Sequence, residues 1–241
     1  MADKKHALVL QHFYENPPGR VGYLLHKHMI PYDLIHVGEV SLPNLSTYGA
    51  IIVLGGTEHL YNKSKYPYTV DEEIYIRRAI EEGVPYLGMC LGGQLLANAF
   101  KAPIRKLPKE HIGFLRIHFT EAGQKDPLYH GLPGYQQAFQ WHEDAFELPL
   151  GAVSLARHED GANQAFRYLT SAYGLQYHIE LTEDMLDIWL HDPTLKKEFI
   201  DAYGTEQYEK VEREAVELYP TYASHSQTLI ENFLRLSRLI E

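Results

Sequence analysis

Short apolar runs alternate with amphipathic segments over the first hundred residues. Four short runs predict strands, at residues 6–13, 33–40, 50–56 and 84–90. The runs at 6–13 and 84–90 are typical of buried strands, and the lack of alternation at 50–56 indicates burial on both faces. Between them, residues 19–29 and 70–83 have apolar positions at helical spacing, and another helix is expected to open after Cys90. Strands that alternate with helices in this way predict an α/β fold with a doubly wound, mostly parallel sheet.

The second half of the chain has a different pattern, with strand-like segments and few helices between them. These segments lie at residues 111–120, 136–146, 152–158, 163–169 and 172–180. The turn formers at 159–161 predict a hairpin, so we expect an antiparallel extension of the parallel sheet. From Thr182 onwards the pattern is helical. The economical interpretation is a single domain over 1–241, with a core at 1–190 and a helical C-terminal extension at 191–241.

Composition and net charge disfavour several classes of function. The 22 Lys and Arg against 32 Asp and Glu give a net charge of −10, which disfavours nucleic acid as a partner. A single cysteine excludes an internal disulfide, and no apolar run is long enough for a membrane span, so we expect a cytoplasmic protein without membrane association. The 14 histidines show no metal-ligand spacing, and no phosphate-binding loop occurs, so neither a metal nor a cofactor is expected.

The single cysteine, Cys90, lies in the run Gly88-Met89-Cys90-Leu91-Gly92, between a predicted buried strand and a predicted helix. This Gly-x-nucleophile-x-Gly pattern is typical of a nucleophile elbow, whose glycines allow a strained turn and close packing. The turn directs the sulfur to the carboxyl end of the sheet, where doubly wound folds bind ligands. The helix N-terminus favours the thiolate. We interpret Cys90 as a nucleophile; the alternative is a buried structural cysteine.

A cysteine nucleophile needs a base, and the last predicted strand supplies one. His178 and Glu180 are two residues apart, so on a strand they project to the same side while Ile179 points into the core. Glu180 would then fix the imidazole tautomer. His142 and Asp144 have the same spacing and form a second candidate pair. We prefer His178 and expect a structural or substrate-contact role for His142.

Two backbone amides complete the predicted site. Gly55 and Gly56 follow a buried strand, where they let the backbone approach a ligand. The amides of Gly56 and Leu91 would form an oxyanion hole. Taken singly, the glycine pair is equally typical of an ordinary turn.

Together these elements resemble the class I glutamine amidotransferase family, and in particular its stand-alone, GMP synthase-like members. The resemblance runs through LVLQH, IIVLGG, PYLGMCLGGQLLANAF, FQWHEDAFELPLGA and GLQYHIE, and covers most of residues 7–186. It implies a flavodoxin-like fold and a triad of Cys90, His178 and Glu180. It also implies that Gln94, one helical turn after the sulfur, contacts glutamine.

The sequence departs from the family pattern at two positions. Where the family usually has proline in His-Pro-Glu, this chain has Ile179, which restores a backbone donor and should preserve the triad geometry. Where the family commonly has glycine after the pocket histidine, this chain has Glu143. We hypothesise that Glu143 biases the protein away from free glutamine, towards γ-glutamyl compounds or partner-activated turnover; the alternative is that Glu143 points to solvent.

The expected reaction is hydrolysis of the γ-amide of glutamine through a thioester, with ammonia passed to an acceptor. The substrate is then a small molecule, glutamine or a γ-glutamyl compound. Without a nucleotide-binding run, a synthetase would bind in trans, or the protein is a stand-alone γ-glutamyl peptide hydrolase. A catalytically silent binding module is a third hypothesis, disfavoured by the intact Cys90, His178 and Glu180.

Overall fold

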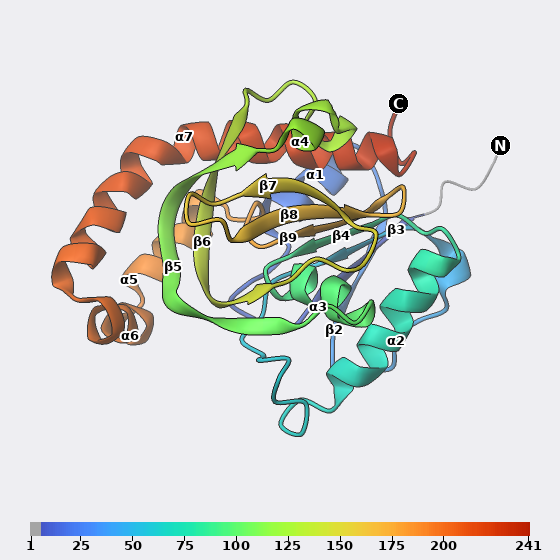
Figure 1. Cartoon of the computed structure of the whole chain (residues 1–241), viewed down its shortest axis with the longest axis horizontal. Helices are drawn as coiled ribbons and strands as arrows, with labels where there is room; N and C mark the ends of the chain where they lie inside the picture. Colours follow the sequence, from blue (N-terminus) through green and yellow to red (C-terminus); the bar gives the residue numbers. More distant parts are fainter. Residues whose placement is uncertain (1–5) are drawn as a thin grey trace.

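The computed structural model describes residues 6–241, apart from the side chain of Lys109, and centres on one mixed β-sheet (Figure 1). Within these residues nine strands pair in the order β2-β1-β3-β4-β9-β8-β7-β5-β6. Their bounds are β1 (His6–Gln11), β2 (Tyr32–His36), β3 (Tyr48–Val53), β4 (Tyr86–Met89), β5 (Ile104–Phe119), β6 (Tyr135–Phe146), β7 (Val153–Arg157), β8 (Asn163–Tyr168) and β9 (Ala172–Leu175).

The sheet joins a parallel half to an antiparallel half. Strands β2, β1, β3, β4 and β9 run parallel, and β8, β7, β5 and β6 continue the sheet with antiparallel pairing. The predicted parallel sheet with an antiparallel extension is therefore confirmed, including the hairpin between β7 and β8. Because parallel strands share one carboxyl edge, the loops after β1, β3, β4 and β9 converge there.

Helices α1 (Gly19–Lys27) and α7 (Thr205–Leu236) cover one face of the parallel half, and α2 (Tyr68–Glu81) and α3 (Leu91–Ala99) cover the other. The remaining helices are α4 (Glu121–Lys125), α5 (Glu183–His191) and α6 (Pro193–Tyr203), with short 3₁₀ turns η1 (Leu45–Thr47) and η2 (Pro127–Tyr129). On β1, Ala7 and Val9 pack with α1 and α7, whereas Leu8 and Leu10 pack with α2 and α3. Both sides of the strand are thus buried, as its unbroken apolar run predicts.

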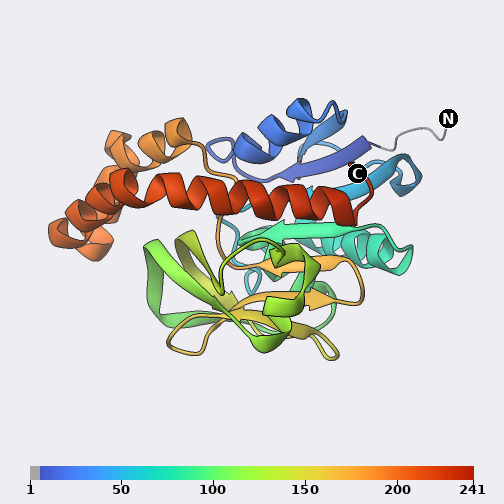
Figure 2. The ribbon, with the colours of Figure 1, turned by 90° about the horizontal axis from the view of Figure 1, so that it is seen from above.

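The C-terminal helices form an arm that packs against the β5–β6 hairpin. Figure 2 shows α7 lying across the length of the molecule, and Figure 1 shows α5 and α6 beyond the outer edge of β5 and β6. A separate apolar cluster fills the space between arm and hairpin, including Phe139, Trp189, Phe199 and Tyr222. Within the described residues, no helix is both long and apolar enough to span a membrane. The division into a core at 1–190 and an extension at 191–241 stays a prediction.

Two strand boundaries differ from the predictions in ways that matter for the site. The last strand was expected to run over 172–180, but β9 ends at Leu175, and beyond it His178 makes only one isolated bridge, to Phe139 of β6. The chain therefore leaves β4 and turns across β6 before the candidate base. Strand β5 begins at Ile104 rather than near 111, because Ile104, Arg105 and Lys106 already pair with β6, ahead of a register irregularity between Lys106 and His111.

Candidate active site

Cys90 occupies a strained turn between β4 and α3. Its backbone has φ 50° and ψ −107°, a left-handed φ that residues other than glycine rarely adopt. Such a conformation costs on the order of 1–3 kcal/mol and is found mainly at functional sites. The turn is anchored by the Cys90 N–H, which donates to the carbonyl of Leu175 at the end of β9, 2.9 Å away. The predicted elbow geometry is present.

The glycines around Cys90 lie where neighbouring backbone leaves no space for a side chain. A Cβ atom on Gly88 would overlap the backbone of Gly92, and a Cβ on Gly92 would overlap the carbonyl of Val53 in β3. One on Gly93 would overlap the carbonyl of Leu175. Each position therefore requires glycine, because another backbone segment passes within contact distance. Close packing of this kind is what the glycine pattern in the sequence predicted.

His178 and Glu180 lie beside Cys90 and are bonded to each other. Nδ1 of His178 is 2.7 Å from Oε1 of Glu180, and both side chains are buried. The backbone N–H of Ile179 donates to Oε2 of Glu180 at 2.8 Å. A proline at this position could not make that bond, so Ile179 adds a donor to the carboxylate. The two side chains meet although neither lies on a regular strand.

His178 and Glu180 each stabilise the charged form of the other. Burial by itself lowers the pKa of His178, but the carboxylate of Glu180 and the hydrogen bond with Cys90 outweigh burial and raise that pKa to about 10. Burial likewise opposes ionisation of Glu180, yet the charge of His178 holds the pKa of Glu180 below its usual value. The arrangement therefore favours a protonated imidazole between a carboxylate and the sulfur.

His142 is held differently. Nδ1 lies 2.8 Å from the carbonyl of Asp144, and Nε2 lies 2.7 Å from Oε1 of Gln140, so both ring nitrogens have partners in the wall of the site. Burial, together with the neighbouring His111, lowers the pKa of His142 to about 3. Of the two candidate histidines, His178 is the one that the fold brings to Cys90.

The glycine loop after β3 lies directly against the other two elements. A Cβ atom on Gly55 would be 2.7 Å from Cε1 of His178 and 3.4 Å from Cβ of Cys90. Leu91 is the first residue of α3, where backbone N–H groups have no partner within the helix. Gly56 and Leu91 are thus close neighbours: a Cβ on Gly56 would be 2.6 Å from Cδ2 of Leu91.

A buried pair of charged side chains packs against the Gly55–Gly56 loop. Nε2 of His12, just after β1, is 2.8 Å from Oε2 of Glu72 on α2, and both side chains are fully buried. Burial lowers the pKa of His12, but Glu72 and Glu58 outweigh it and raise the pKa. The carboxylate of Glu58 and Cβ of His12 also lie where a Cβ on Gly56 would be. A buried ion pair therefore fixes the position of the loop.

Cys90 opens onto a cleft with two adjoining parts. The inner part, about 180 Å³, is lined by Phe13, Asn16, Gly55, Gly56, Thr57, Cys90, Trp141, His178, Trp189, Leu195 and Glu198. The outer part, about 340 Å³, is lined by Gly56, Thr57, Glu58, His59, Cys90, Gln94, Glu110, Trp141, His142, Glu143, Asp144 and Tyr203. Helix α6 thus contributes to both walls. A larger cavity of about 830 Å³ lies at the amino ends of β3 and β4, away from Cys90.

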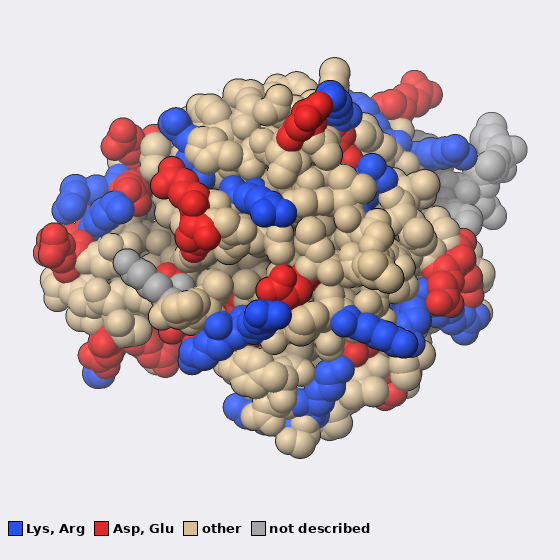
Figure 3. Space-filling model, in the orientation of Figure 1, with Lys and Arg blue, Asp and Glu red and all other residues tan. Residues whose placement is uncertain are grey.

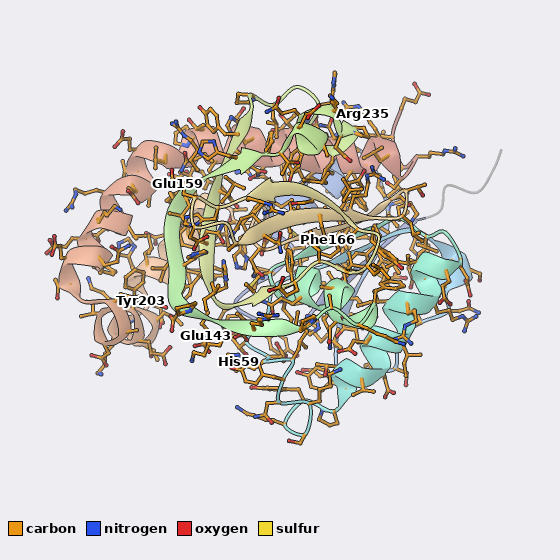
Figure 4. All side chains as sticks on the ribbon, viewed as in Figure 1. His59, Glu143, Glu159, Phe166, Tyr203 and Arg235 are labelled. Carbon is orange, nitrogen blue, oxygen red and sulfur yellow. The ribbon has the colours of Figure 1, made fainter. Side chains whose placement is uncertain are left out.

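The pocket residues expected from the sequence all line the outer part. Gln94 is buried, and its Nε2 donates to the carbonyl of Asp144 at 3.2 Å. The carboxylate of Glu143 is 2.6 Å from Nζ of Lys106 and 3.1 Å from Nε2 of His59 (Figure 4). Glu143 therefore neither points freely to solvent nor presents an unpaired charge to the cleft.

Comparison with known proteins agrees with this geometry. The sequence profile described as Glutamine amidotransferase class-I matches residues 24–188. The chain belongs to the class I glutamine amidotransferase family. Within that family it is 29% identical over 178 residues to the glutamine amidotransferase-like protein YfeJ of Salmonella typhimurium, covering 73% of this chain and 74% of YfeJ.

The similarity to GMP synthases covers only part of those longer proteins. The chain is 31% identical over 156 residues to the glutamine-hydrolysing GMP synthase of Thermosipho africanus, which covers 64% of this chain but only 28% of the synthase. Among solved structures, a glutamine amidotransferase from Thermotoga maritima superposes with a TM-score of 0.82 at 26% identity, covering 95% of this chain and 97% of the other. One from Methylobacillus flagellatus has the same fold, with a TM-score of 0.84 at 24% identity, covering 96% and 95%.

Two residues at the site were not identified from the sequence of this chain. Asn16 donates from Nδ2 to Oε1 of Glu180 at 3.0 Å and is buried. Trp189 of α5 packs edge-on against the His178 ring, with centroids 5.2 Å apart, and donates from Nε1 to the carbonyl of Glu15 at 2.9 Å. The one available signal for Asn16 was its place just after the first buried strand, at the edge where ligands bind.

Proposed function

We propose that this class I glutamine amidotransferase hydrolyses the γ-amide of glutamine, with Cys90 as nucleophile, His178 as general acid and base, and Glu180 orienting the imidazole. The observation that carries the proposal is a continuous chain of contacts. Cys90, in a strained turn, lines the same cavity as His178, and Nδ1 of His178 is 2.7 Å from Oε1 of Glu180. Nucleophile, base and orienting group in this order are typical of covalent acyl transfer.

In the first half of the reaction, the thiolate of Cys90 attacks the γ-carbonyl carbon and forms a C–S bond. The carbonyl oxygen becomes an oxyanion, which the amides of Gly56 and Leu91 would stabilise. Losing one such donor typically costs about 10²–10³ in rate. His178 then donates its proton to the amide nitrogen as the C–N bond breaks. Ammonia leaves, and a γ-glutamyl thioester remains on Cys90.

In the second half, neutral His178 accepts a proton from a water molecule as the water oxygen attacks the thioester carbonyl. The C–S bond breaks, glutamate is released, and the imidazolium–thiolate pair is restored. Glu180 and Asn16 keep the imidazole aligned through both proton transfers, since their hydrogen bonds do not involve the reacting atoms. General acid–base catalysis of this kind contributes typically about 10²–10⁴ in rate.

The shape of the cleft supports a second candidate, hydrolysis of γ-glutamyl peptides. The outer cavity of about 340 Å³ adjoins the inner one at Cys90, Gly56 and Trp141. A γ-linked amino acid would extend from the scissile bond into this space, with an amine instead of ammonia as leaving group. For glutamine hydrolysis, by contrast, the ammonia would pass to an acceptor, for which a synthetase bound in trans is the partner we propose.

The test is turnover of glutamine and of γ-glutamylglycine by the full chain, with ammonia and glutamate measured separately. Glutamine hydrolysis releases both products equally, whereas γ-glutamylglycine releases glutamate without ammonia. Cys90→Ser is expected to lower either activity by about 10³-fold or more. Because Cys90 is the single cysteine, alkylation by iodoacetamide reports on that residue alone. Near-native turnover by Cys90→Ser would refute the mechanism, and glutamine binding without turnover of either substrate would identify a silent binding module.

A further inference from the structure

Outside the catalytic cleft, two histidines and a carboxylate converge from separate strands. His111 lies on β5, and His158 and Asp160 flank Glu159 in the turn between β7 and β8, which Figure 4 labels beside β5. Nε2 of His111 is 3.0 Å from Oδ2 of Asp160, and Nδ1 of His158 is 2.9 Å from Oδ1. The ligand atoms of all three residues lie within 4.8 Å of one another. We refer to these three residues as the His111 cluster.

The chemistry of the His111 cluster matches one class of ion. Imidazole nitrogen with a carboxylate suits first-row transition ions, whereas Mg²⁺ and Ca²⁺ prefer sites built from oxygen alone. Nitrogen and oxygen ligands lie about 2.0–2.2 Å from zinc. Two ligands on one ion are then roughly 3 Å apart at angles near 90–110°. The two nitrogen–oxygen separations in the cluster, 3.0 and 2.9 Å, are of this size.

The carboxylate of Asp160 is held in position and is open to solvent. The N–H of Ala162 donates to Oδ1 of Asp160 at 2.9 Å, which fixes the side chain within its turn. Asp160 is exposed and also lines a cavity of about 530 Å³, so an ion can reach it from solvent.

The histidine side of the cluster is held by packing. His111 is buried, with its ring 4.4 Å from that of His158 and 5.2 Å from that of His142, measured between centroids. One ligand thus comes from a buried strand position, and the other two come from a single hairpin turn. Because His142 lines the outer cleft, the cluster lies directly behind a wall of the catalytic cleft.

We propose that His111, His158 and Asp160 bind one divalent first-row transition ion, with the remaining coordination positions filled by water. The inference is independent of the proposed catalysis, since none of the three residues has a part in it. Sequence spacing gave no sign of the site, because its ligands come from β5 and from a turn two strands later.

The experiment uses the full chain as Cys90→Ala, free of affinity tag and treated with EDTA, titrated with ZnCl₂ by calorimetry. Cys90→Ala is chosen because a thiolate beside His178 would itself bind zinc. One ion is expected per chain. Adding His158→Ala or Asp160→Asn should weaken binding at least tenfold, since loss of even a residue that only supports a metal ligand typically costs about 10–100-fold in affinity. His191→Ala, which removes another histidine paired with two carboxylates, should leave binding unchanged.

Asp160→Asn guards against a folding artefact, because an asparagine oxygen can still accept from Ala162. Zinc should raise the melting temperature of the Cys90→Ala protein and leave that of Cys90→Ala/Asp160→Asn unchanged. An excess of Mg²⁺ should not compete. Absence of zinc binding in Cys90→Ala would overturn the proposal, as would binding that His158→Ala and Asp160→Asn leave intact.

Discussion

Nδ2 of Asn16 donates a hydrogen bond to Oε1 of Glu180 at 3.0 Å, although 164 positions separate the two residues in the chain. The same oxygen is 2.7 Å from Nδ1 of His178, and Oε2 accepts from the N–H of Ile179. Three donors thus hold one buried carboxylate. The orientation of the proposed base therefore depends on the loop after β1 as well as on the segment after β9.

Asn16→Ala is expected to lower kcat about 10–100-fold with little change in KM, because a hydrogen bond to a charged group contributes about 1.5–3 kcal/mol. Steady-state kinetics on glutamine would measure this. Asn44→Ala is the matched control, since that asparagine caps η1 away from the site. An unchanged kcat for Asn16→Ala would show that Asn16 has no role in positioning Glu180.

His178→Ala is expected to reduce turnover by about 10²–10⁴, the usual contribution of a general acid–base group. His142→Ala should reduce it less than about tenfold, because both nitrogens of His142 are bonded within the wall and its pKa is far below neutrality. The two variants are compared by kcat at neutral pH. If His142→Ala is inactive and His178→Ala retains turnover, the base has been assigned to the wrong histidine.

Glu180→Gln is expected to lower the pKa of His178. With the carboxylate charge removed, burial becomes the dominant influence and opposes protonation of the ring. Titration of ¹⁵N-labelled histidine by NMR should give a midpoint near 10 in the native protein and a clearly lower one in Glu180→Gln. Equal midpoints would contradict the proposed charge pairing.

The same pair predicts how stability depends on pH. Because folding raises the pKa of His178, its contribution is complete below about pH 6.5, the unfolded value, and is lost as pH rises through about 10. Because folding lowers the pKa of Glu180, its contribution is present above about pH 4.5 and is lost in acid. Urea denaturation of the native protein and Glu180→Gln should therefore differ most between about pH 4.5 and 6.5. A difference that grows towards pH 10 would show the opposite sign.

Glu143→Gly and Lys106→Ala are expected to shift substrate preference in opposite directions. The first removes a carboxylate from the outer cleft, and the second removes the lysine partner of that carboxylate while His59 remains. Relative to γ-glutamylglycine, kcat/KM for free glutamine should rise in Glu143→Gly and fall in Lys106→Ala. The change should be about two- to fivefold each, because partly exposed ion pairs contribute under about 1 kcal/mol. Unchanged ratios in both variants would mean that Glu143 takes no part in selection.

Much of this protein could be predicted from short stretches of its sequence. The parallel half of the sheet follows from unbroken apolar runs, and the turn at Cys90 follows from Gly88 and Gly92, whose absence of side chains is required by local packing. His178 and Glu180 could be paired because they are two residues apart, so their contact is a local property of the chain. The surface is likewise a sequence property: on the face in Figure 3, acidic side chains are interspersed with basic ones.

Only the tertiary structure decided which distant residues complete the site. Tyr177 and Ile179 are buried whether the sheet continues or the chain turns into the core, so the apolar pattern could not show that β9 ends at Leu175. No periodic signal marked Asn16, Trp189 or the His111 cluster. A contact between two remote segments does not constrain the spacing of residues within either segment. Their positions depend on how the strands are ordered in the sheet and on where the C-terminal arm packs against it.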